Sequence, residues 1–300
     1  MRTIEDIAPV QFNPPHDARL PVEALSIADL KQRAPAEHFE RLQRADFFRL
    51  IGVLEGETRP MVDFTHYDIR TADWLLVRPG QVFRYNFSQQ WSGWIVVFRP
   101  DSLVASGTGN APEGSDWLQR IEDLACLHRL SPEDHSCMQG IARQMQQDCV
   151  IGSAPNPDTA VRHALLRLGL ASALLRLWSW QNSRATAMGQ PSGGSARYRR
   201  FRQRLERDFA NHHQVQYYAQ ALGMGEKTLS RVCLDACGEP AKAVINQRLI
   251  LEAKRFLAHT TRSVQAIASD LGFAEVTHFV KFFKKQTSLT PLAFRLSVMA

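Results

Sequence analysis

The feature that most constrains the fold is a helix-turn signal that occurs twice in the last hundred residues. The first copy is AQALGM at residues 219–224, and the second is ASDLGF at residues 268–273, so alanine, leucine and glycine recur at a constant offset of 49. A small residue, an apolar residue and a turn glycine are what two helices need to cross closely through a short turn. The repeat predicts two helix-turn-helix units in tandem.

The segment between the two copies, 242–258, has the pattern of one long helix. Its apolar residues lie on one helical stripe and its charged residues on another. The apolar stripe comprises Ile245, Leu249, Ala253, Phe256 and Leu257, and the charged stripe comprises Arg248, Glu252 and Arg255. We expect this helix to join the two units.

A series of shorter motifs accompanies these helices in a fixed order. The series consists of Leu229-Ser230-Arg231, Arg248, Ala253-Lys254 and Leu257, and then IASDLGF, HF, FFKK, TP and FR between Ile267 and Arg295. Over about Tyr198 to Arg295 the chain thereby resembles the DNA-binding region of the AraC/XylS family of transcriptional regulators. Ser288 stands where that family usually has a closing-turn glycine, and Cys233 where it usually has phenylalanine. The resemblance implies promoter DNA and RNA polymerase as partners, with activation as the default.

Charge supports this interpretation independently of the family. Residues 197–300 contain 17 Lys and Arg against 8 Asp and Glu, a net charge of +9, whereas the rest of the chain has 19 against 22, a net charge of −3. A basic domain joined to a slightly acidic one is expected of a protein that binds the phosphate backbone. Together with the tandem helix pairs, this charge predicts double-stranded DNA as the partner.

Alignment through the turn glycines selects candidate DNA contacts. Those expected to face the major groove are Lys227, Thr228, Ser230 and Arg231 in the first recognition helix, and Val276, Thr277, His278 and Lys281 in the second. Those expected to hold phosphates are Lys284, Lys285 and Arg295. Glu226 and Glu275 begin the two helices, where a negative charge is favoured electrostatically, and we interpret both as structural.

The first hundred residues have the pattern of a compact antiparallel β-structure. Short apolar or alternating runs such as FFRLIGVLEG and WSGWIVVFRP are separated by Gly, Pro and Asp. Their order is similar to the cupin-like sensor domain of the same family: a strand ending in Glu55-Gly56, then Asp63-Phe64, then Pro79-Gly80-Gln81-Val82 and a strand at Trp94–Phe98. The predicted class is therefore α+β, with an N-terminal cupin-like β-barrel, following helices and an all-α C-terminal domain.

The residues of this barrel favour ligand binding over metal catalysis. Phe83 follows the Pro-Gly turn where a metal-ligating histidine would stand in a catalytic cupin, and no His-x-His pair occurs in the chain. We therefore expect no metal and no cofactor, but an aromatic pocket for a small-molecule effector. The candidate ligand contacts are Phe83, Tyr85 and Trp94, with Arg44 at the barrel mouth for an anionic group.

Composition divides the chain into a sensor domain at 1–180, a linker at 181–197 and a DNA-binding domain at 198–300. The barrel is expected at about 1–105 and helices at about 115–180. The linker is rich in Gly, Ser, Ala and Gln and is predicted to be flexible. The leucine-rich helix before it either covers its own domain or forms part of a homodimer interface.

These patterns predict a non-enzymatic, ligand-responsive transcription regulator. No apolar run approaches the roughly 20 residues that span a bilayer, and the N-terminus has no export signal, so we expect no membrane association and a cytoplasmic location. Two other functions remain open: a metal-dependent cupin-type enzyme tethered to DNA, and an architectural DNA-binding protein without an effector.

Overall fold

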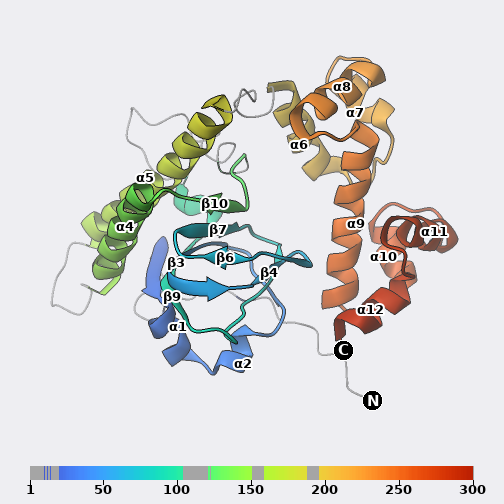
Figure 1. Cartoon of the computed structure of the whole chain (residues 1–300). Coiled ribbons are helices and arrows are strands. Elements are labelled where there is room, and N and C mark those ends of the chain that lie inside the picture. Colours follow the sequence, from blue (N-terminus) through green and yellow to red (C-terminus); the bar gives the residue numbers. More distant parts are fainter. Residues whose placement is uncertain are drawn as a thin grey trace. The chain divides into compact units, whose positions relative to one another are not determined.

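The structure, a computed structural model, describes residues 10, 12, 14, 20–103, 121, 123–150, 159–187 and 196–299 (Figure 1). The chain divides into two compact units, with a boundary between Arg184 and Ala185. Among the described residues, every strand lies in the first unit and the second unit is helical. The predicted α+β class, with a β-rich N-terminal and an all-α C-terminal domain, is confirmed.

The first unit contains two antiparallel sheets. The larger has the order β1-β9-β3-β7-β10, with β6 paired to β3, and the smaller has the order β2-β8-β4-β5. The larger sheet consists of β1 (Val22–Ser26), β3 (Phe48–Thr58), β6 (Ile69–Arg70), β7 (Asp73–Val77), β9 (Trp91–Phe98) and β10 (Leu127–Arg129). The smaller consists of β2 (Gln43–Arg44), β4 (Met61–Val62), β5 (Thr65–His66) and β8 (Val82–Arg84).

The larger sheet is buried on both faces, which explains why β7 is a continuous apolar run. Because side chains alternate along a strand, β3 sends Phe48 and Leu50 to one face and Ile51 and Val53 to the other. The second face meets residues of the smaller sheet in a shared interior cluster, as the walls of a barrel do. The first face is covered by helices.

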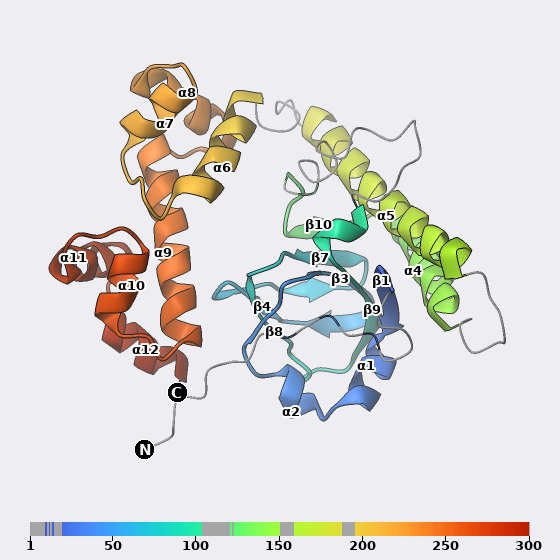
Figure 2. The ribbon, with the colours of Figure 1, turned by 180° about the vertical axis from the view of Figure 1, so that it is seen from behind.

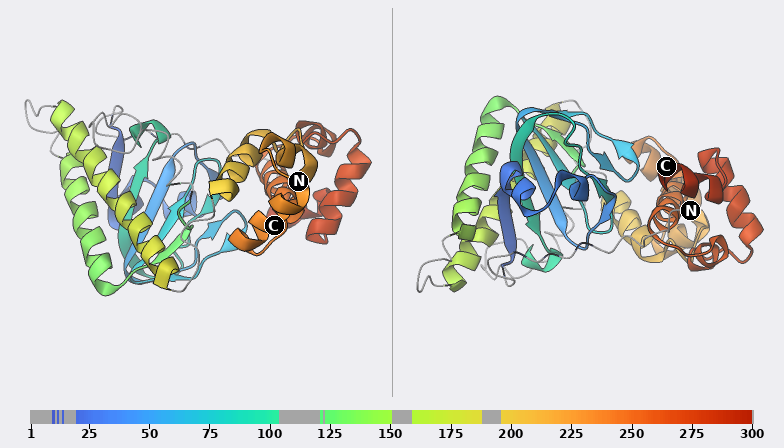
Figure 3. Two further views of the ribbon diagram at one scale, coloured as in Figure 1. Left: turned by 90° about the horizontal axis from the view of Figure 1, so that it is seen from above. Right: turned by 90° about the horizontal axis from the view of Figure 1, so that it is seen from below.

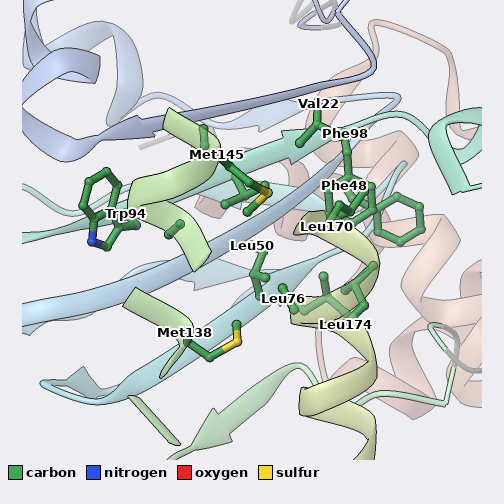
Figure 4. Close-up of a cluster of buried hydrophobic side chains, with 14 of the residues drawn as sticks. Val22, Phe48, Leu50, Leu76, Trp94, Phe98, Met138, Met145, Leu170 and Leu174 are labelled. Atoms are coloured by element: carbon green, nitrogen blue, oxygen red, sulfur yellow. The ribbon is translucent and has the colours of Figure 1, made fainter. Parts of the chain in front are cut away.

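Two long helices, α4 (Pro132–Val150) and α5 (Thr159–Ala187), lie together over that outer face, as Figures 2 and 3 show from different directions. Figure 4 shows Met138 and Met145 of α4, with Leu170 and Leu174 of α5, reaching the strand side chains. The unit also contains α1 (Ile27–Arg33), α2 (Ala36–Phe39) and the short 3-10 helix η1 (Pro100–Leu103).

The second unit is built around α9 (Ala241–His259), which has α6–α8 near one end and α10–α12 near the other (Figures 1 and 2). The predicted helix at 242–258 is thereby confirmed. The other helices are α6 (Ala196–Asp208), α7 (Val215–Ala221), α8 (Glu226–Cys237), α10 (Val264–Asp270), α11 (Val276–Thr287) and α12 (Pro291–Met299). No helix in the described part of the chain combines the length and apolar character needed to cross a membrane.

Two boundaries differ from the sequence-based expectation. The segment predicted as a linker is helical at both described ends, because α5 continues to Ala187 and α6 begins at Ala196; residues 188–195 lie outside the described part. The glycines and prolines of that segment all lie within 188–195, so its ends contain no helix breaker. In addition, β10 extends the larger sheet into a segment that was expected to be helical. The sequence did not indicate this strand because its three residues are too few to show alternation.

Candidate functional site

The turns of the two helix-turn-helix units are closed by the same main-chain hydrogen bonds. The donor and acceptor pairs are Gly223 N to Gln220 O (3.0 Å) and Met224 N to Ala219 O (2.9 Å) in the first unit, and Gly272 N to Ser269 O (3.0 Å) and Phe273 N to Ala268 O (2.9 Å) in the second. Both turn glycines have a left-handed backbone, with φ of +66° at Gly223 and +74° at Gly272. The sequence repeat is therefore a structural repeat.

The second helix of each unit buries one side and exposes the other. Leu229 and Cys233 of α8 are fully buried, as are Phe279 and Phe283 of α11, and each pair lies one helical turn apart. The opposite face of both helices is exposed, which is the arrangement required of a helix that enters a groove.

The two departures from the family pattern are accommodated locally. Ser288 ends α11 with a φ of +64°, the conformation that Gly238 adopts at the end of α8 with a φ of +76°. Cys233 fills a core position of α8, and burial raises the pKa of its thiol to about 12. It therefore packs as a small apolar residue.

Most predicted DNA contacts lie on the exposed faces of α8 and α11. Lys227, Thr228 and Arg231 are exposed, whereas Ser230 is half-buried. Arg231 Nε lies 3.0 Å from Asp235 Oδ1 in a solvent-exposed ion pair. On α11 the exposed residues are Thr277, His278, Lys281, Lys284 and Lys285, and Val276 is half-buried.

The two recognition helices differ in charge. The α8 sequence contains two basic and two acidic residues, a net charge of zero, whereas α11 contains three lysines and no acidic residue, a net charge of +3. Glu275 precedes α11 and accepts a hydrogen bond from Thr277 Oγ1 at 3.1 Å, a local contact consistent with a structural role. Attraction to phosphate is therefore stronger at the second helix.

Arg295 does not fit its predicted role as a phosphate contact. It is only 8% exposed, its Nε donates to Leu257 O at 3.1 Å, and its Nη2 donates to Arg262 O at 2.6 Å. Arg295 thus joins α12 to the end of α9 and the following loop. The prediction was wrong because a basic residue near a chain end has the same sequence pattern whether it faces solvent or satisfies main-chain carbonyls.

The basic helix α6, which the sequence motifs did not identify, precedes the first helix-turn-helix pair. Six arginines lie in α6, and four of them are exposed: Arg197, Arg200, Arg202 and Arg207. Their density within one short segment is the sequence signal that could have identified them. They add positive charge to the same unit as α8 and α11.

The aromatic residues predicted to line the ligand pocket lie on two different faces of the sheets. Phe83 and Tyr85 belong to the interior cluster, where their rings meet edge to face with centroids 4.6 Å apart. Trp94 instead lies on the outer face of the larger sheet, among the side chains beneath α4 and α5 (Figure 4). Trp94 therefore does not line the interior as predicted, and its neighbours Ile95 and Val97 are among the residues of β9 that do.

Two arginines of this region, Arg44 and Arg49, bear on the predicted anion site. Arg44 is half-buried and donates from Nε to Gly80 O at 3.0 Å, so its ligand role stays a prediction. Arg49, which the sequence motifs did not identify, is only 3% exposed and is the second residue of β3. The sequence feature that could have identified Arg49 is a charged residue at an inward position of an apolar strand. Within the described residues, no cluster of three or more His, Cys, Asp or Glu is arranged to hold a metal.

Comparison with known proteins agrees with both units. A model described as an AraC-like ligand binding domain matches residues 25–136, and a helix-turn-helix domain model matches residues 218–297. The geometry and these matches define a protein that joins a ligand-binding domain of this type to a helix-turn-helix domain. Together the two models cover well over half of the chain. The chain belongs to the AraC family of regulators.

Individual relatives are distant. The transcriptional activator RhaS of Escherichia coli O139:H28 is 26% identical over 191 residues, 59% of this chain and 65% of RhaS. The regulatory protein PocR of Salmonella typhimurium is 32% identical over 56 residues, 19% of this chain and 18% of PocR. The chain thus spans less than two thirds of either relative. Among solved structures, ToxT from Vibrio cholerae has a TM-score of 0.42 at 11% identity, covering 93% of this chain and 98% of ToxT.

Proposed function

We propose that the protein is a sequence-specific DNA-binding transcription regulator whose activity responds to a small molecule bound in the N-terminal barrel. The observation that supports this proposal is the duplication of the helix-turn-helix unit. Two turns closed by identical hydrogen bonds each position a second helix with a buried inner face and an exposed polar outer face. Such helices read base edges in the major groove.

The charge difference between α8 and α11 supports different contributions of the two helices to DNA binding. With its three lysines, α11 supplies sequence-independent attraction, whereas α8, with no net charge, contributes mainly through the geometry of Arg231. The Arg231–Asp235 pair is exposed and worth at most about 1 kcal/mol, so Arg231 is free to exchange Asp235 for a guanine edge. One monomer then covers two major-groove segments about 34 Å apart.

Three further features belong to the same proposal. The effector contacts the aromatic interior that contains Phe83 and Tyr85. The regulator acts in the cytoplasm, where promoter DNA is accessible, and by resemblance to its family it activates through RNA polymerase. The chain performs no catalytic step.

Binding measurements with the full chain test the DNA-binding part. After selection of a preferred site from random duplexes, Arg231→Ala is expected to cost about 1–3 kcal/mol on that site and much less on random DNA. Lys284→Ala is expected to weaken both equally and to lower the salt slope by about one. Arg41→Ala, at an exposed arginine of the first unit, is the matched control. Equal losses on both DNAs for Arg231→Ala would reassign it to the backbone.

We also propose that α5 forms a homodimer interface. One side of α5, with Leu166, Leu170 and Leu177, is buried in its own domain. The other side exposes an apolar stripe over about four turns, and this stripe does not cover the domain's own core. Its members are Val161 (52% exposed), Leu165 (48%), Leu168 (54%) and Leu175 (37%). An apolar stripe along one helix suits a two-fold pairing with the same helix of a second copy.

Sedimentation tests this pairing. Leu168→Glu is expected to convert the dimer to a monomer, because it places a charge in the centre of the stripe. Leu292→Glu changes an equally exposed leucine on α12 (59%) and is expected to leave the dimer intact. A dimer that survives Leu168→Glu but not Leu292→Glu would move the interface to α12.

A further inference from the structure

Arg49 is a buried cation on the inward face of the larger sheet. It pairs in register with Val77 of β7 and Val97 of β9, and both valines belong to the interior cluster. Directly opposite residues of neighbouring strands share a face, so the guanidinium also points inward. Arg49 lies near the ends of these three strands, and its 3% exposure shows that the side chain is nevertheless buried.

The surroundings of Arg49 are aromatic and contain little to neutralise it. Its Cζ lies 4.9 Å from the ring centre of Phe47 and 5.3 Å from that of Phe83. Its Nη2 donates to Gln43 Oε1 at 3.1 Å. Within the described part of the chain, Arg49 forms no ion pair with a carboxylate. A guanidinium carries five donors, so this environment leaves most of its capacity unused.

A buried charge without an opposite charge is unfavourable, and arginine cannot avoid the cost by losing its proton. Burial lowers the pKa of Arg49 and raises the pKa of Tyr85, while the interaction between the two groups opposes both changes. A barrel that needed only to fold would be served as well by an apolar side chain at this position. The charge therefore suits a partner that arrives from outside the chain.

The aromatic cluster extends from this charge to a partly buried residue. Phe83 contacts Tyr85, whose ring stacks on Phe87 with centroids 5.4 Å apart, and Phe87 is only partly buried. Tyr85 itself is 5% exposed and interacts electrostatically with Arg49. Planar rings next to a fork of N–H donors match a molecule that joins an apolar body to a carboxylate.

We propose that Arg49 recognises the carboxylate of the effector, with Tyr85 as a second donor, and that the effector is an apolar monocarboxylate. This inference rests on the proposed function only in treating the barrel as an effector site. It replaces Arg44 with Arg49 as the principal anion-binding residue.

Thermal melting of the full chain tests the assignment without DNA. All six tryptophans lie before residue 185, so their fluorescence follows the first unit alone. The probes are benzoate, phenylacetate and octanoate, each compared with its primary amide. We expect at least one carboxylate to raise the Tm of the wild type by about 5 °C at roughly a hundred times its Kd, and its amide to cause no shift.

The decisive variant is Arg49→Met, with Arg84→Met as the matched control. Arg84 lies between Phe83 and Tyr85 and so points to the opposite face of β8. We expect Arg49→Met to abolish the shift and, without a probe, to melt at or above the wild-type temperature, while Arg84→Met responds as the wild type does. A wild type that responds to none of the three carboxylates, a shift that survives Arg49→Met, or a lower Tm for Arg49→Met alone would each overturn the assignment.

Measuring DNA binding and promoter output with the same probes and variants separates this inference from the proposed function. If carboxylates act through Arg49 but neither DNA binding nor promoter output changes, the site stands and ligand-responsive regulation fails. If DNA binding responds to a ligand that Arg49→Met still binds, regulation stands and the assignment of Arg49 fails.

Discussion

Replacing Gly272 with alanine is expected to destabilise the DNA-binding unit by more than about 3 kcal/mol, whereas the same change at Gly223 should cost only about 1–2 kcal/mol. Both glycines have a left-handed backbone, so both substitutions introduce similar local strain. A Cβ at Gly272 would also lie 2.1 Å from Ala210 O, a main-chain atom that has little room to move. At Gly223 nothing lies within 4 Å of the added atom.

The close approach at Gly272 is one of the contacts between the second helix-turn-helix unit and the loop that precedes the first. The loop that contains Ala210 also places His213 Nε2 2.8 Å from Leu271 O and the His213 ring 4.8 Å from that of Phe273. Alanine at residue 272 would therefore push against the loop through which the two helix-turn-helix units contact each other. Burial lowers the pKa of His213, so this contact does not require a protonated ring near neutral pH.

Far-UV circular dichroism of the full chain, compared with tryptophan fluorescence, measures this difference, because helix lost without a tryptophan transition belongs to the helical second unit. The tryptophan transition reports on the first unit and should be unchanged in both variants. Equal losses of stability for Gly272→Ala and Gly223→Ala would show that backbone strain alone determines the destabilisation. The loop at Ala210 would then move to accommodate the added Cβ.

The repeat made the helical unit predictable because its signals are local. A turn glycine, the small residue four positions before it and the helix that follows all lie within one short segment, and each keeps its role in the structure. The contact of Gly272 with Ala210 was not predictable in this way, since it joins residues 62 positions apart. Sequence showed two equivalent glycines, and only the structure distinguishes them.

The barrel was predictable as a class but not in the direction of its side chains. Trp94, Val96 and Phe98 alternate with Ile95 and Val97, and both sets are buried, so the sequence contains no polar face to fix the register. The same two-sided burial made Arg49 easy to miss, because one charge in an apolar strand is more often expected at the surface. Arg295 shows the converse error, a buried arginine taken for a surface contact.

Glu252 provides the second test with a large expected effect. It lies on α9, is 6% exposed, and accepts from Arg248 Nη1 at 2.9 Å and from Arg255 Nη1 at 3.1 Å. Arg255 is itself only 7% exposed. The charged stripe that the sequence predicted is therefore partly an internal ion-pair group, which Glu206 extends by accepting from Arg248 Nε at 2.7 Å.

Glu252→Leu is expected to destabilise the second unit by about 3–5 kcal/mol, because it removes the shared carboxylate and leaves a buried guanidinium without that charge. Asp235→Ala removes the exposed Arg231–Asp235 pair, in which the side chains are 77% and 61% exposed, and should change stability by no more than about 1 kcal/mol.

Chemical denaturation followed by circular dichroism, with tryptophan fluorescence as the internal reference for the first unit, compares these two variants. Salt sharpens the comparison: screening weakens the exposed pair but acts little on the buried group, so the loss in Glu252→Leu should persist at about 1 M salt. A loss that disappears in salt would mean that water reaches Glu252 and that α9 is stabilised mainly by its apolar stripe. A loss of stability that persists would show that the ion pairs of α9 help to hold the recognition helices α8 and α11 in place.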